Sequence, residues 1–302
     1  MPAVTPAVSA ITTSAPLKAN PVPAPVEAPL DISALFVADN LARKNAAHAF
    51  ATLASNEGPD ASLSLALIEA VLKALADKKS PAVRQGVAEA ITAIINAGAT
   101  KALEPYFVQS GLLAALLETF ADKVQTVRNA ALEAVKSYAA AMNPWSTATV
   151  LPILLEQVKT AGKWQIKTGS LTVINQLVVS APLQTSRLMP EIVPVLAEAL
   201  WDTKADVKKA ARDTLTKATA LVSNKDIERF IPALIKALVN PVEEVPKTIQ
   251  LLSATTFVSE VDSATLSLMV PLLSRGLSEK LTATKRKVAV YVFSSNLIAD
   301  FS

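Results

Sequence analysis

The sequence predicts an all-α protein, a right-handed solenoid of about six to seven helix pairs. Three observations indicate this fold class. A proline-containing signature returns about every 40 residues, and apolar residues recur at helical spacing between its returns. The apolar residues, which make up 51% of the chain, are mostly alanine, leucine and valine, and only 5% of residues are aromatic. Such small side chains suit helix pairs that pack closely together.

The repeating unit is clearest in residues 189–222, which are expected to form two helices joined by a turn at Trp201, Asp202 and Thr203. The apolar stripe of the first helix is Ile192, Val195, Leu196 and Leu200, and that of the second is Val207, Ala211, Leu215, Ala218 and Leu221 or Val222. Neither stripe can be buried within its own pair. Each pair therefore needs an adjoining copy.

The copies are recognised by an apolar residue followed by proline in the first helix of each pair. The prolines are Pro152, Pro194, Pro232 and Pro271, and they are 42, 38 and 39 residues apart. A period near 40 residues is typical of HEAT and armadillo repeats. Two helices per unit, with proline in the first, favour the HEAT type.

The N-terminal segment differs in composition from the rest. Residues 1–30 are rich in proline and alanine, and we expect them to be disordered, because proline fixes φ and removes helix donors. Residues 31–302 are expected to form the HEAT-repeat domain. Its first repeat is degenerate, with a short helix at 31–36 and a longer one at 38–54, as suits a terminal repeat with one face in solvent.

Six further repeats are expected to follow, separated by glycine, proline and asparagine breaks. They span 61–98, 99–142, 143–180, 181–222, 223–261 and 262 to the end, and the last is expected to be incomplete or divergent after about residue 290. Ser80 and Pro81 form a typical helix start, with a capping serine and a proline at the first helical position.

Composition restricts the class of protein. The net charge of +3 is only mildly basic, so charge must act through its placement. The chain has no cysteine, which fits a reducing compartment, and we expect a cytoplasmic protein. No apolar run approaches the roughly 18 residues needed to cross a bilayer, so we expect no membrane span.

The residues that carry catalytic chemistry are scarce. His48 is the only histidine, and we expect it to be a helix-surface or packing residue rather than a metal ligand or general base. The glycines form no phosphate-binding loop. The pair Glu243 and Glu244 is of a kind that commonly stabilises a helix N-terminus. We therefore expect no catalytic residue, cofactor, metal or small-molecule substrate, and no enzyme activity from this chain.

A basic residue recurs near the start of the second helices. These residues are Arg84, Arg128, Lys167, Lys208 and Lys285, and they are expected to form a row along one edge of the solenoid. One interpretation is a structural ladder, in which each basic residue pairs with the acid of the preceding or neighbouring turn. The predicted pairs are Asp77 with Arg84, Asp122 with Arg128 and Asp202 with Lys208. We favour the ladder for Arg84 and Arg128.

Toward the C-terminus the basic residues exceed what a ladder needs, which indicates contact with RNA phosphates. The candidate RNA-binding residues are Lys163, Lys167, Lys204, Lys208, Lys209, Arg212, Arg275, Lys285, Arg286 and Lys287. Trp164 and Trp201 stand near lysines, where an indole could stack on a base, but packing over the turn is favoured. Trp145 is expected to act as a hydrophobic staple where its helix begins.

Five runs of sequence carry a resemblance to a known family. They are 163–167, 189–207, 224–232, 254–258 and 266–277. Together they resemble the N-terminal HEAT domain of fungal translation elongation factor 3, closely over about residues 100–290 and loosely over 31–99. A HEAT region of the ribosome-associated Gcn1-type scaffold shares some of these runs.

The resemblance implies a cytosolic, ribosome-binding module that contacts ribosomal RNA and ribosomal proteins. In that family two later cassette domains hydrolyse ATP. The sequence does not contain them, and it departs from the family after Val290, so we expect a fragment, a truncated gene product or a mispredicted coding sequence. Two alternatives stay open: a Gcn1-like ribosome-associated scaffold, and a generic HEAT adaptor for protein partners.

Overall fold

The computed structural model describes residues 35–36, 39–56, 61–254, 261–278 and 282–294. The regular structure of these residues is entirely helical, so the all-α prediction is confirmed. All of the described helices belong to the unit from Asp31 to Ser302. The predicted disorder of residues 1–30, most of the predicted helix at 31–36, and the end of the chain after Ser294 lie outside the described residues.

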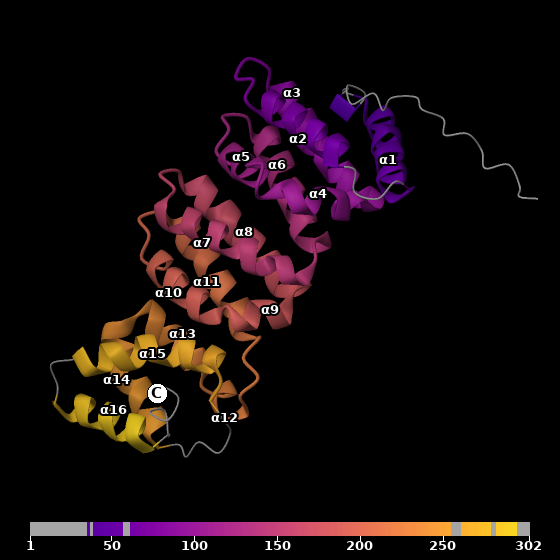
Figure 1. The fold of residues 1–302 in the computed structure, drawn as a ribbon. Helices are drawn as coiled ribbons and strands as arrows, with labels where there is room; N and C mark the ends of the chain where they lie inside the picture. The colour runs from indigo at the N-terminus through magenta and orange to yellow at the C-terminus, as the bar shows by residue number, and fades with distance from the viewer. Residues whose placement is uncertain (1–34, 37–38, 57–60, 255–260, 279–281, 295–302) are drawn as a thin grey trace, which may run out of the picture. The chain divides into compact units, whose positions relative to one another are not determined.

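The second helices of six repeats are regular. They are α3 (Pro81–Ile94), α6 (Gln125–Ala141), α8 (Trp164–Ser180), α11 (Ala205–Thr219), α14 (Pro241–Ser253) and α16 (Thr282–Ser294). The first four form a stack, side by side in chain order (Figure 1). The Ser180 hydroxyl donates to the Ala139 carbonyl at 2.8 Å, and so links α8 to α6.

The first helices are less regular than the sequence predicts. Three are continuous: α2 (Ala61–Leu75), α7 (Thr147–Thr160) and α15 (Ser263–Ser278). The helix α1 (Asn40–Asn56) is the longer, second helix of the first repeat, and it packs on α3. Three are split into two pieces: α4 (Thr100–Phe107) and α5 (Leu112–Thr119), α9 (Pro182–Arg187) and α10 (Met189–Ala199), and α12 (Lys225–Glu228) and α13 (Ile231–Val239). Gly111 separates the first two pieces with a φ of 83°, which favours glycine. Pro190 and Pro232 stand in the first positions of α10 and α13, where proline is well tolerated.

The stack changes after α11. This helix makes only a small contact with α13 of the next repeat, whereas α10 packs along α15, the first helix of the last repeat. The helices α13, α14, α15 and α16 pack mainly on one another. The last two repeats therefore form a second packing group.

The predicted core stripes of residues 189–222 are buried. The buried members of both helices are Ile192, Val195, Leu196, Leu200, Val207, Ala211, Leu215 and Ala218. At the end of the second stripe Val222 is buried and Leu221 is only half-buried. The predicted cap is also present, because the Ser80 hydroxyl accepts a hydrogen bond from the Val83 N–H at 3.4 Å.

Gly169 allows α8 to approach the turn that follows α5. A Cβ atom at this position would lie 2.2 Å from the Phe120 ring, which is itself buried. We expect Gly169→Val to lower the free energy of unfolding by about 1 to 3 kcal/mol, the usual cost of overpacking. Gly162→Ala is the control, since nothing lies within 4 Å of its added Cβ. Equal denaturation midpoints for the two variants would show that the contact is not tight.

Candidate nucleic-acid interface

The turn between the two helices of a repeat carries an aspartate that caps its own backbone. Each carboxylate accepts a hydrogen bond from the N–H two residues later. The pairs are Asp77 with Lys79, Asp122 with Val124 and Asp202 with Lys204, at 2.8, 2.9 and 2.9 Å. This bond satisfies an N–H beside the start of the second helix and leaves the second carboxylate oxygen for another donor.

The second donor comes from the preceding repeat. Arg84 Nε lies 2.8 Å from Asp122 Oδ2, and Lys167 Nζ lies 2.9 Å from Asp202 Oδ2. The predicted ladder was therefore wrong in its partners, because the carboxylate is directed toward the previous repeat by its own cap. Toward their own turns, Arg84 and Arg128 instead donate to backbone carbonyls: those of Asp77 and Asp122, each at 2.6 Å.

These contacts lower the pKa of both paired aspartates. Burial pushes the pKa of Asp122 up, but hydrogen bonds from Arg84 and the Val124 N–H outweigh it, and the pKa lies below its ordinary value. Burial acts on Asp202 in the same way, and the Lys204 N–H and Lys167 lower its pKa. A carboxylate with a depressed folded-state pKa stabilises the fold only while it is ionised.

We expect this stabilisation to be complete above the unfolded-state pKa of about 4 and to be lost as the pH falls through the lower folded-state values. The melting temperature should therefore decrease below about pH 4. The Asp122→Asn, Asp202→Asn double variant should melt at a lower temperature at neutral pH and should lose less on acidification. Parallel melting curves against pH for parent and variant would contradict the ladder.

Exposed lysines occupy four successive turns. They are Lys78, Lys123, Lys163 and Lys204, and the first turn also carries Lys79. Lys78, Lys123 and Lys163 lie close together, because they line one cavity of about 410 Å³ together with Arg84, Glu118 and Asp122. Sequence reasoning missed Lys78 and Lys123. The repeated Ala-Asp-Lys of residues 76–78 and 121–123, which becomes Ala-Gly-Lys at 161–163, is the signal that could have found them.

The C-terminal candidates lie in two groups. Lys204 is exposed at the N-cap position of α11, and Lys208, Lys209 and Arg212 lie exposed along it. Lys285, Arg286 and Lys287 are exposed on α16, and Arg275 is exposed on α15. The predicted single row is not continuous, because α11 belongs to the long stack and α16 to the second packing group.

Among the candidate RNA-binding residues, Lys167 forms an ion pair within the fold. Its side chain is 20% exposed and its ammonium is paired with Asp202. Lys163, four residues earlier, is exposed beside the start of the same helix. The structure thus favours a structural role for Lys167 and leaves the other nine candidates on the surface.

The tryptophans are more exposed than expected. Trp201 is 60% exposed, so it is not packed over its turn as predicted. Trp145, which was predicted to act as a hydrophobic staple, is 66% exposed. The guanidinium of Arg187 lies 5.8 Å from the centre of the Trp145 ring, which is within the range of a cation–π contact. Trp164 is 37% exposed, and it lines a groove of about 210 Å³ with Arg128 and Asn129.

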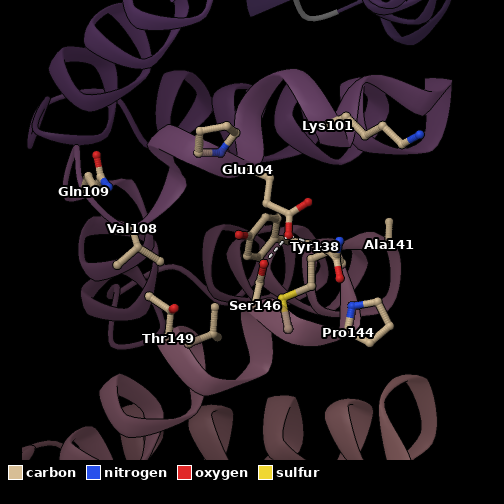
Figure 2. A pocket seen from close by; sticks show the side chains of 13 residues that line it. Lys101, Glu104, Val108, Gln109, Tyr138, Ala141, Pro144, Ser146 and Thr149 are labelled. Atoms are coloured by element: carbon tan, nitrogen blue, oxygen red, sulfur yellow. Dashed lines mark hydrogen bonds between the residues drawn. The ribbon is translucent and has the colours of Figure 1, made fainter. Parts of the chain in front are cut away.

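A cavity of about 720 Å³ lies between α4, the end of α6 and the turn before α7 (Figure 2). Glu104 accepts hydrogen bonds there from the Asn143 N–H, at 2.9 Å, and from the Ser146 hydroxyl. Burial, reinforced by the charge of Glu104, raises the pKa of Tyr138, whose ring stacks on Phe107 at 3.7 Å. Glu104, the acidic residue that lines this cavity, therefore links α4 to the next repeat by hydrogen bonds.

Other chemical groups are dispersed. In the part of the chain that the structure describes, no three histidine, cysteine, aspartate or glutamate side chains gather where they could hold a metal ion. None of the described helices is both long enough and apolar enough to cross a membrane. His48 is exposed on α1.

The fold and its charged surface define an α-helical repeat protein with exposed basic groups on successive units. Within that class, the chain belongs to the family described as EF3 N-terminal HEAT repeat, whose model matches residues 43–215. A second model, described as Elongation factor 3/GNC1 HEAT repeat, matches residues 243–299. The predicted HEAT type and the resemblance are confirmed. The interval between the two matches falls where the stack of second helices changes.

Similar proteins include elongation factor 3 of Mycosarcoma maydis, which is 50% identical over 274 residues, or 91% of this chain and 25% of that protein. Elongation factor 3 of Gonapodya prolifera is 42% identical over 83% of this chain and 23% of its own length. Elongation factor 3B of Saccharomyces cerevisiae is 50% identical over 63% of this chain and 18% of its own length. The chain thus spans about a quarter or less of these relatives.

Among solved structures, importin beta aligns with 87% of this chain and 35% of its own, at 19% identity and a TM-score of 0.40. Designed armadillo repeat proteins align at similarly low scores, for example 0.35 over 88% of this chain at 16% identity. The family assignment depends on the sequence matches.

Proposed function

We propose that this chain is the ribosome-binding HEAT module of a translation elongation factor, acting in the cytoplasm and contacting both ribosomal RNA and ribosomal proteins. Membership of the elongation factor 3 HEAT family supports the class of function. The observation that carries the contact is the set of exposed basic side chains on α11 and α16 and in the turns, which form no ion pair among the described residues.

Electrostatics explains why these side chains suit RNA. A lysine or arginine near a phosphate releases bound counterions, so a row of them gives affinity without reading the base sequence. The ion pairs between repeats also favour RNA binding, because they neutralise two aspartates of the turns. Asp122 is paired with Arg84, and Asp202 is paired with Lys167. The lysines of the turns therefore face solvent with little acidic compensation.

The alternatives are weaker. The family model that covers residues 43–215 is described by elongation factor 3 alone, whereas the shared Elongation factor 3/GNC1 description applies to residues 243–299. This favours the elongation factor over the Gcn1-like scaffold. We propose that the chain acts by binding rather than by catalysis, since no phosphate-binding loop stands in its sequence.

Ribosome co-sedimentation tests the proposal. We expect the purified chain to sediment with ribosomes at low salt and to remain in the supernatant when free ribosomal RNA is added in excess, because the competitor offers the same phosphates. A chain that stays in the supernatant with ribosomes at low salt is a protein-only adaptor or has another role, and the proposal would then be abandoned.

A further inference from the structure

The turns that precede α6, α8 and α11 differ in whether they contain the capping aspartate. In the first and last, an aspartate holds two donors: the backbone N–H two residues on, and a basic side chain of the preceding repeat. Gly162 stands at this position in the turn before α8. The donors that would surround an acid there belong to Arg128 and Trp164.

Arg128 makes the same kind of backbone contact as its counterpart Arg84 but has no carboxylate partner among the described residues. Arg128 Nη1 donates to the carbonyls of Asp122 and Lys123 at 2.6 and 3.1 Å, and Nη2 donates to Gln125, so the guanidinium is anchored as that of Arg84 is. Unlike Arg84, it forms no ion pair within the described ranges. Asp122 lies near it, but the two oxygens of Asp122 are held by Val124 and Arg84.

The backbone of the same turn also lacks a carboxylate. As at α6 and α11, no side chain caps the first turn of α8, whose N-cap residue is Lys163. In the other two turns the aspartate still binds the N–H two residues later, just before the helix, and Gly162 has no carboxylate to do so. The missing carboxylate therefore leaves an anchored guanidinium and an uncapped helix start without an acid beside them.

The surroundings are basic and partly aromatic. Lys123 and Lys163 are exposed on either side, and both line the cavity shared with Lys78. On the other side, Arg128 and Trp164 line a groove with Gln125, Asn129 and Thr168. Glu118 lines the same cavity as these lysines, and Asp122 there is already paired with Arg84. Arg128, Lys123 and Lys163 still exceed what Glu118 alone would neutralise, which favours a phosphate on a continuous polyanion over an acidic side chain of a protein.

We propose that the position of Gly162 is a binding site for one phosphate of an RNA backbone. Arg128 and the uncapped start of α8 donate to its oxygens, Lys123 and Lys163 bind the flanking phosphates, and the exposed face of Trp164 stacks on an adjoining unpaired base. This inference rests on the proposed function and names a site for it on the long stack, apart from the C-terminal candidates.

Gly162→Asp tests the site, because it supplies within the chain the acid that the neighbouring repeats carry. A Cβ at this position meets nothing within 4 Å, and its φ is not in the left-handed region, so the substitution fits. We expect the variant to melt at a higher temperature. Its affinity for a fluorescein-labelled 12-nucleotide oligouridylate should fall on the order of tenfold, the equivalent of one charge-assisted hydrogen bond.

Two controls make the result specific. Gly162→Asn restores the cap without the charge and should keep most of the affinity. Arg128→Gln should lose affinity for the oligouridylate by itself, and adding Gly162→Asp to it should cost much less than it costs in the parent, because both changes act on one site. Arg84→Gln should reduce the melting temperature and leave the affinity for RNA nearly unchanged.

The outcomes separate this site from the proposed function. If the parent binds ribosomes and oligouridylate and Gly162→Asp binds both equally well, the site is wrong and the proposed function stands. If the parent binds neither, both are wrong. If Gly162→Asp instead abolishes binding of a polyglutamate peptide and leaves RNA binding intact, the partner is an acidic protein and the phosphate assignment is overturned.

Discussion

Leu196→Ala should lower the free energy of unfolding by about 2 to 5 kcal/mol, the usual range for truncating a buried leucine. Leu196 is fully buried, with 0% of its surface exposed. It lies on α10, which packs on α7, α11 and α15, so the cavity left by the truncation would open where the long stack meets the last repeat. Equilibrium denaturation followed by circular dichroism measures the change.

Leu183→Ala is the matched control. Leu183 lies on α9 of the same repeat and is 73% exposed, so its truncation should change stability by no more than about 0.5 kcal/mol. Similar losses in the two variants would mean that α10 does not face the core. An unchanged midpoint in Leu196→Ala would place this side chain on the surface.

The second large effect concerns binding. Replacing Lys208, Lys209, Arg286 and Lys287 by glutamine should leave helicity intact, because all four are exposed on α11 and α16. It should reduce the slope of log affinity against log salt by up to about 3, since each lost phosphate contact contributes about 0.7 to 0.9. Ribosome co-sedimentation over a salt series provides both slopes.

The control removes the same charge from another part of the fold. Lys73, Lys101, Lys225 and Lys236 are exposed on the first helices α2, α4, α12 and α13. Their joint replacement by glutamine should leave the slope nearly unchanged if the second helices and turns carry the interface. Equal losses in the two quadruple variants would indicate attraction by overall charge. Replacing the α11 and α16 pairs separately would show whether both groups are used.

Much of the fold was predictable because its signals are local. The proline period and the apolar stripes of residues 189–222 depend on spacing along one helix, and the structure buries the predicted members. The split first helices were harder. A glycine or proline inside an apolar pattern is compatible with a bend or with a break, and packing on neighbouring repeats decides between them.

The ladder was mispredicted for a different reason. Arg84 was paired with the acid closest to it in sequence, Asp77, but its carboxylate partner is Asp122 in the next repeat, 38 residues later. The direction of the aspartate side chain within its turn decides which repeat supplies its basic partner. Sequence spacing alone does not predict that direction. The exposure of Trp145 and Trp201 likewise depends on how far the adjacent repeats cover each turn.

The change of packing after α11 leaves no trace in the period. The signature prolines Pro194, Pro232 and Pro271 continue at 38 and 39 residues, although α10 packs along α15 across the intervening repeat. Two candidates that were predicted as members of one row, Lys208 and Lys285, therefore belong to different packing groups. Sequence spacing predicted their exposure but not their separation.

The salt dependence of ribosome affinity for the unaltered chain tests the central claim most directly. If about four of the exposed basic residues each neutralise one phosphate, the slope of log affinity against log salt should be on the order of −3 to −4. Binding should then weaken steeply between low and physiological salt. A slope near zero, with affinity retained at high salt, would contradict the account and indicate that an apolar protein contact holds the chain to its partner.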